Sequence, residues 1–345
     1  MTLPATTRPV PLPQISSRTW EHPADRAALN AMRRIPVFDE VVRKVASFFG
    51  ERGVRQLFLA NAVQVGPTQR PELDALLSEV LVTLDWEVRP ELYVTESPLA
   101  NAAAVGFEKP FIIINSELLR VLSREERKFI LAHEVGHIIS GHTTYRTIAL
   151  LVMTVGLGSL PFLAGMALLP FQLALLEWYR KSEFSADRAG LLGIQAPDTA
   201  YRAFMMMAGG EAEGDTLSVE AFKEQVSRYE TSADGVDMLF RIINTVFRDH
   251  PFATVRAAEL QQWLRTGEYE QILAGHYLRR GQEPQDLGSD MRDAREYYGE
   301  QAREAFSGVA DAVGRARDAF STAFRNRNAP GGGSGGTGAG GGGAA

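Results

Sequence analysis

Residues 133–137 read His-Glu-Val-Gly-His, a spacing that could hold a zinc ion. On a helix, positions i and i+4 lie on one face, one turn apart. The imidazoles of His133 and His137 could therefore bind a single Zn²⁺ at about 2.0–2.1 Å. Glu134 would lie about 100° round the helix from His133, beside an open coordination position. There its carboxylate could accept a proton from zinc-bound water, whose pKa falls toward about 7.

A zinc site that hydrolyses peptides needs a third protein ligand. His142 is the nearest candidate, but on a continuous helix it would point about 140° away from His137, so we expect it to be exposed or to face a loop. Glu183 and Asp187 share one face of a later helical segment, EFSAD. Glu183 could bind zinc while Asp187 accepts the N–H of a ligating histidine. Alternatively, both carboxylates are solvated charges on a surface helix.

The helix that carries the HExxH motif has a recognisable start. Ser123-Arg-Glu-Glu126 matches a capping box, and the helix should continue through residues 128–146. Just before it, residues 91–97, 101–107 and 110–116 are short, apolar and bounded by turn residues. We expect these three segments to form a small sheet that contains a hairpin.

Other segments show helical spacing of apolar residues. Residues 24–50 predict one or two helices, with a break near Pro36 and an end at Gly50. Residues 71–86 and 198–210 predict two more helices. The sequence therefore indicates an α+β fold that is predominantly α-helical, with a small sheet next to the HExxH helix.

Residues 147–176 contain no charged side chain and could form one membrane span, which needs about 20 residues. A single span would place His137 and Glu183 on opposite sides of the membrane, where they could not share an ion. Two spans need about 40 residues, and the run has only 30. We therefore expect an apolar helical hairpin that dips into a bilayer, lies on its surface, or packs in the core or in a homo-oligomer.

The motif HEVGH followed by E-x-x-A-D resembles peptidase family M48, zinc metallopeptidases of the gluzincin class that include HtpX and the CaaX-prenyl endopeptidases. Asn101-Ala-Ala-Ala104 with the following FIIINSELL, and His250-Pro251 with Arg256, are similar to further elements of that family. The resemblance covers roughly residues 75–262. It implies a zincin-like peptidase domain.

The resemblance also implies a zinc metalloendopeptidase that hydrolyses peptide bonds with zinc-bound water activated by Glu134. It implies one Zn²⁺ per chain, with three ligands: His133, His137 and Glu183. Asp187 would support a ligand, while His250 and Arg256 would stabilise the tetrahedral oxyanion or hold Asp187 in place.

An extended peptide could add to the strand at residues 110–114 if that strand lies at the sheet edge. The residues expected there are Asn101, Ile112, Ile113 and Ile114. The substrates would be polypeptides, unfolded or close to a membrane. Two alternatives are a non-catalytic, membrane-peripheral scaffold or chaperone-like adaptor, and a helical protein in which the motifs occur by chance.

The composition excludes other chemistry. The chain has no cysteine, which excludes disulfides, thiol nucleophiles and iron–sulfur clusters. A net charge of −6 offers no basic surface, so we expect no nucleic-acid partner. The first residues lack the apolar stretch of a signal peptide, so we expect a cytoplasmic protein, peripheral or hairpin-anchored at the inner face of the cell membrane.

The same composition suggests the domain limits. We expect a disordered arm over residues 1–18, rich in Pro and Thr, and a peptidase domain over 19–285 that includes the hairpin at 147–176. An amphipathic helix over 289–326 and a glycine-rich, disordered tail over 327–345 would follow.

Overall fold

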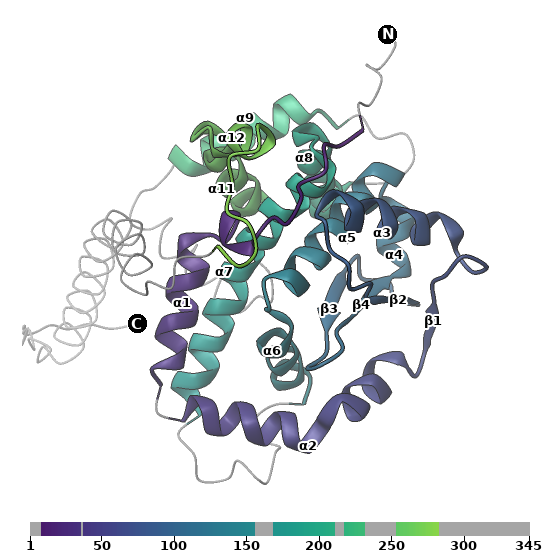
Figure 1. Cartoon of the computed structure of the whole chain (residues 1–345), viewed down its shortest axis with the longest axis vertical. Coiled ribbons are helices and arrows are strands. Elements are labelled where there is room, and N and C mark those ends of the chain that lie inside the picture. The colour runs from purple at the N-terminus through teal and green to yellow at the C-terminus, as the bar shows by residue number, and fades with distance from the viewer. Residues whose placement is uncertain (1–7, 36, 156–167, 211–216, 232–252, 283–345) are drawn as a thin grey trace, which may run out of the picture.

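The computed structural model describes five parts of the chain: residues 8–35, 37–155, 168–210, 217–231 and 253–282. Within them the protein is mostly helical, with a small mixed sheet (Figure 1). The expected α+β class is therefore confirmed. The turn of the apolar hairpin, His250, and the C-terminal helix and tail lie outside the described residues.

The sheet has the strand order β1-β2-β4-β3. Its strands are Ala62–Gln64 (β1), Glu91–Thr95 (β2), Ala102–Val105 (β3) and Phe111–Asn115 (β4). The expected hairpin is β3 with β4, whereas β2 and β4 are parallel. Because β4 lies between β2 and β3, the expectation that a peptide adds to the 110–114 strand is wrong. The edge strand on this side is β3.

The side chains of β4 lie in the core on both faces of the sheet. Ile112 and Ile114 are buried in one hydrophobic cluster, and Ile113 is buried in the other. A strand alternates its side chains between two faces, so this apolar run is covered on both sides. These three isoleucines hold the sheet in the core and are not a peptide-binding surface.

Helix α5 (Arg124–Ile139) begins where the sequence predicts. The Ser123 hydroxyl accepts the Glu126 N–H, and the Glu126 carboxylate accepts the Ser123 N–H. The helix ends earlier than expected, because Gly141 has a φ of +69° and turns the chain. A separate helix, α6 (Thr143–Val155), follows.

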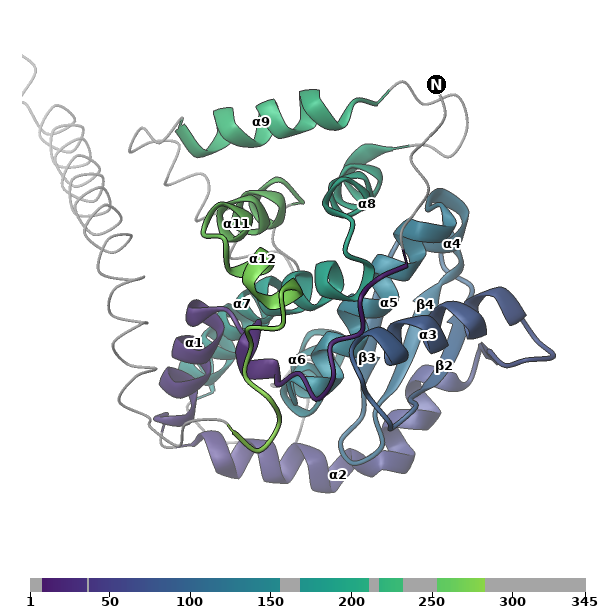
Figure 2. The same ribbon diagram turned by 45° about the horizontal axis from the view of Figure 1, so that its top comes forward.

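Helix α7 (Leu169–Ile194) packs closely against α5. A Cβ at Gly136 of α5 would lie 2.5 Å from the Cβ of Ala189, and one at Gly190 would lie 2.8 Å from the Phe129 ring. Small residues thus allow the two backbones to approach. Figure 2 shows α6 beside α7, so the described arms of the apolar run lie next to each other.

Residues 8–18, the described part of the expected disordered arm, pack against the rest of the protein. Leu12 and Ile15 are fully buried, and the Leu12 N–H donates to the Thr83 carbonyl (2.8 Å). A short 3-10 helix, Ser17–Thr19, and helix α1 (Pro23–Arg33) follow, and α1 runs beside α7 (Figure 1).

Helix α2 (Phe38–Leu59) is interrupted at the expected position. Gly50 has a non-helical conformation, with a φ of +58°, so the first helical segment ends there and a second segment continues beyond the kink. The remaining helices of the described ranges are α3 (Pro71–Thr83), α4 (Ser116–Val121), α8 (Pro197–Gly209), α9 (Val219–Thr231), α11 (Ala253–Arg265) and α12 (Glu268–Leu273). None of the helices in the described ranges combines the length and the hydropathy needed to cross a membrane.

Candidate metal centre

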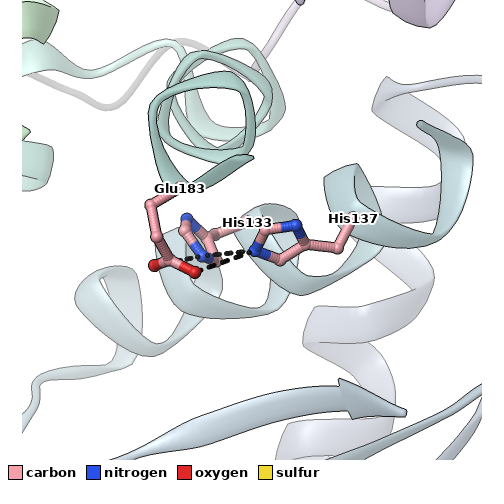
Figure 3. Close-up of side chains that lie close together, drawn as sticks. All are labelled: His133, His137 and Glu183. Atoms are coloured by element: carbon pink, nitrogen blue, oxygen red, sulfur yellow. Dashed lines mark hydrogen bonds and ion pairs between the residues drawn. The ribbon is translucent and has the colours of Figure 1, made fainter. Parts of the chain in front are cut away.

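Three buried side chains from two helices converge on one point. His133 and His137 come from α5, and Glu183 comes from α7 (Figure 3). The two Nε2 atoms lie 3.1 Å apart. Glu183 Oε2 lies 3.5 Å from His133 Nε2, and Oε1 lies 3.4 Å from His137 Nε2.

These distances fit a metal ion. Ligand atoms arranged tetrahedrally at 2.0–2.1 Å from zinc are about 3.3 Å from one another. Two imidazole nitrogens and one carboxylate oxygen also form a donor set that zinc prefers in catalytic sites. Within the described ranges no other group of three such side chains comes as close together.

A carboxylate and a guanidinium support His133. Its Nδ1 lies 3.0 Å from Asp187 Oδ1, so Nε2 is the nitrogen that faces Glu183. Arg256, on α11, donates from Nε to Asp187 Oδ2 (2.8 Å) and from Nη2 to Oδ1. Arg256 Nη1 also lies 3.5 Å from Glu183 Oε2. The structure therefore brings Asp187 and Arg256 to the site.

The two histidines differ in electrostatics. Burial lowers the pKa of His133, but its contacts with Asp187 and Glu183 outweigh burial and raise this pKa to about 9. Burial and the positive charge of Arg146 keep the pKa of His137 well below its usual value. Binding a metal at neutral pH therefore requires His133 to lose a proton, whereas His137 is already neutral.

Glu134 is held beside the ligand group by the sheet edge. Its Oε2 accepts the backbone N–H of Ala104 in β3 (2.7 Å), and its Oε1 lies 4.0 Å from His133 Nε2. Burial, with a contribution from Glu183, raises the pKa of the Glu134 carboxyl. A carboxylate with a raised pKa is a better proton acceptor.

Arg146 is a site residue that the sequence analysis missed. It is fully buried at the start of α6 and donates from Nη1 to Glu183 Oε1 and from Nη2 to the Tyr179 hydroxyl (3.1 Å). The one available signal was its position as the last charge before the apolar run. An isolated charge in that position does not reveal its partner.

The expectation that His142 is exposed or faces a loop is wrong. His142 is buried, and its Nδ1 lies 3.0 Å from His137 Nδ1. The expectation assumed a continuous helix, but the chain turns at Gly141. The backbone N–H of His142 then donates to the His137 carbonyl (3.0 Å), which directs the His142 side chain back toward the candidate ligands.

A narrow cleft opens beside the ligand group. Asn101, just before β3, and Ala102, its first residue, line the cleft, with apolar walls from Leu118, Ile130 and Met207. Its volume is about 30 Å³, which is room for one water molecule. A much larger cavity of about 820 Å³ lies between α1, α11 and α12 and contains none of the three candidate ligands.

Comparisons with known proteins agree on one family. The family described as Peptidase family M48 matches residues 67–264. The plastoglobule-localized metallopeptidase 48, chloroplastic, of Arabidopsis thaliana is 31% identical over 269 residues, which are 77% of this chain and 78% of that protein. A protease HtpX homolog of Helicobacter pylori (strain Shi470) is 26% identical over 203 residues, covering 51% and 65%.

A second protease HtpX homolog, from Paraburkholderia phytofirmans, is 26% identical over 249 residues, which are 65% of this chain and 84% of that protein. No solved structure matches this chain. The family match spans more than half of the sequence and includes all three side chains that converge between α5 and α7. This chain is therefore a metallopeptidase and belongs to peptidase family M48.

Proposed function

We propose that the protein is a zinc-dependent metalloendopeptidase that binds one Zn²⁺ through His133, His137 and Glu183. The observation that carries this proposal is the spacing of their donor atoms, 3.1–3.5 Å, which is the spacing of tetrahedral zinc ligands. The fourth position would remain open toward the cleft.

Zinc bound there would lower the pKa of a water molecule and polarise the carbonyl of the scissile bond. Glu134 accepts the proton of the attacking water and returns it to the leaving amine, while the Ala104 N–H fixes the orientation of its carboxylate. For Arg256, its two hydrogen bonds to Asp187 favour a role in holding that carboxylate over contact with the oxyanion.

The substrate in this proposal is an extended polypeptide that lies along β3, next to Asn101 and Ala102. This edge strand borders the cleft and leads directly to Glu134. A cleft of about 30 Å³ cannot hold a peptide segment, so binding requires it to widen. Unfolded chains fit this requirement better than compact proteins do.

The described arms of the apolar run serve the protein's own core. Ile148, Leu151 and Val152 of α6 are buried with Phe171 and Leu175 of α7. This packing supports a structural role for these arms, which bring His137 and Glu183 together in one site.

Replacing Glu134 by Gln tests the mechanism. We expect the Glu134→Gln protein to bind one zinc per chain and to cleave unfolded casein at least about 100-fold more slowly than wild type, because the amide cannot accept a proton. Glu125→Gln, an exposed position on the same helix, should cleave at the wild-type rate. Activity that survives Glu134→Gln would disprove the proposed role of Glu134.

The same assay separates the alternative function. A folded wild-type protein that carries one zinc per chain and cleaves no unfolded polypeptide would favour the scaffold or adaptor over the endopeptidase. The presence of Glu134 and of the complete ligand group argues against that alternative.

A further inference from the structure

The buried carboxylate of Asp25 is connected to His137 through His142. His137 Nδ1 lies 3.0 Å from His142 Nδ1, and His142 Nε2 lies 3.1 Å from Asp25 Oδ2. His137, His142 and Asp25 are all buried. They come from α5, from the turn after it, and from α1, so the chain of contacts joins the ligand group to the N-terminal helix.

The proton positions in this chain of contacts follow from the metal site at one end and the Asp25 carboxylate at the other. If Nε2 of His137 faces the metal, then Nδ1 of His137 carries the proton and donates it to His142. Nδ1 of His142 must then be unprotonated, so the N–H of His142 is on Nε2, where it donates to Asp25. The Asp25 carboxylate can only accept a hydrogen bond. The His137–His142 and His142–Asp25 hydrogen bonds therefore each have one donor and one acceptor.

Asp25 is itself fixed in place. The Ser185 hydroxyl donates to Asp25 Oδ2 (2.6 Å) and accepts the backbone N–H of His22 (2.9 Å). Asp25 Oδ2 thus faces both the His142 ring and the Ser185 hydroxyl. Ser185 lies on α7 between Glu183 and Asp187, which ties α1 to the helix that carries the third candidate ligand.

We infer that Asp25 and His142 are positioning residues for the metal ligand His137. They would fix the tautomer and the ring orientation of His137 and increase its basicity, as Asp187 does directly for His133. This inference rests on the proposed zinc site. Asp25 precedes residues 67–264, so a segment outside the family match would contribute to the metal centre.

Zinc affinity tests the inference on the full-length chain. We expect Asp25→Asn and His142→Gln each to weaken zinc binding about tenfold in competition with a chromophoric chelator, the lower end of the effect of outer ligand partners. The double variant should bind zinc no more weakly than the weaker single variant, because one break already interrupts the chain. Asp39→Asn, an exposed carboxylate on α2, is the matched control and should bind zinc like wild type.

Two further measurements separate positioning from a purely structural role. If Asp25 only docks α1, Asp25→Asn lowers the melting temperature of the metal-free protein but leaves zinc affinity and the visible absorption of the Co²⁺-substituted protein unchanged. That result would overturn the inference, as would losses in zinc affinity that multiply in the double variant. We expect both zinc affinity and the Co²⁺ spectrum to change.

The outcomes also separate this inference from the proposed function. A wild-type chain that binds no zinc would overturn both. A wild-type chain that binds one zinc, together with an Asp25→Asn variant of equal affinity, would overturn only the inference. If Asp25→Asn does not fold, His142→Gln tests the same chain of contacts, and wild-type affinity in that variant would overturn it.

Discussion

At the scale of single residues, the side chains around the candidate ligands matter as much as the ligands themselves. Asp187 accepts two hydrogen bonds from Arg256 and contacts His133 Nδ1. The charge of the guanidinium compensates the charge of the buried carboxylate. These contacts hold the Asp187 carboxylate where it can orient an imidazole.

Removing that charge should weaken zinc binding. We expect Asp187→Asn to lower zinc affinity by about 10–100-fold. Arg256→Lys should cause a smaller loss, because an ammonium cannot reproduce the paired contacts of the guanidinium. Titration with a competing chelator measures both effects, and Asp198→Asn at an exposed position on α8 is the control. Wild-type affinity in Asp187→Asn would contradict the assigned role.

The histidine pair could be anticipated from the sequence because its spacing is local: His133 and His137 are one turn apart on a helix whose capping box marks its start. Glu183 and Asp187 have the same spacing, which fits a surface pair equally well, and the resemblance to family M48 indicated Glu183 as the third ligand. His142 and Arg146 could not be anticipated. Their positions depend on the turn at Gly141, after which α6 leaves α5 in a new direction.

At the scale of elements, the close approach of α5 and α7 sets the ligand distances. Gly136 lies between the two candidate histidines, and its Cα faces Ala189 of α7. Because Gly136 has no side chain, α7 comes close enough to α5 for Glu183 to reach the imidazoles. The distance between the two helices therefore determines the distances between the candidate ligand atoms.

Adding one methyl group at this contact should disturb both stability and metal binding. We expect Gly136→Ala to destabilise the fold by about 1–3 kcal/mol, because the new Cβ would lie 2.5 Å from the Ala189 Cβ. Zinc affinity should also fall as the helices separate. Gly53→Ala in α2, where the nearest atom is 3.8 Å away, should instead stabilise by up to about 1 kcal/mol. Urea unfolding and chelator competition measure the two effects, and a Gly136→Ala protein as stable as wild type would refute the argument.

Local sequence patterns predict some of the helices and strands but not the order of strands in the sheet. Local signals predicted α3, the start of α5, and three short strands that include a hairpin. The order of strands was not predictable, because β4 pairs with β2 across a connection that no local pattern encodes. Strand β1 has three residues and one partly buried side chain, too little for a periodic signal.

At the scale of the whole molecule, the N-terminal segment is part of the hydrophobic core. Residues 8–33 run from α3 to α7 and contribute Leu12, Ile15 and Trp20 to the main hydrophobic cluster. The Pro- and Thr-rich composition gave no sign of this packing, because a few buried side chains are enough to hold a short segment. His22 then joins α1 to α11 through Glu259 (3.2 Å).

The burial of His22 should make stability depend on pH. His22 Nδ1 accepts the Ala24 N–H, and burial and Arg188 lower the pKa of His22 from 6.5 to about 4, against an opposing effect of Glu259. Between these values the unfolded chain binds more protons than the folded one, so this contribution is complete above pH 6.5 and falls by about 3 kcal/mol by pH 4. His22→Asn keeps a capping oxygen but does not titrate, so urea unfolding should show a correspondingly smaller loss between pH 7 and pH 4. Equal losses in the two proteins would show that His22 is not buried as a neutral imidazole.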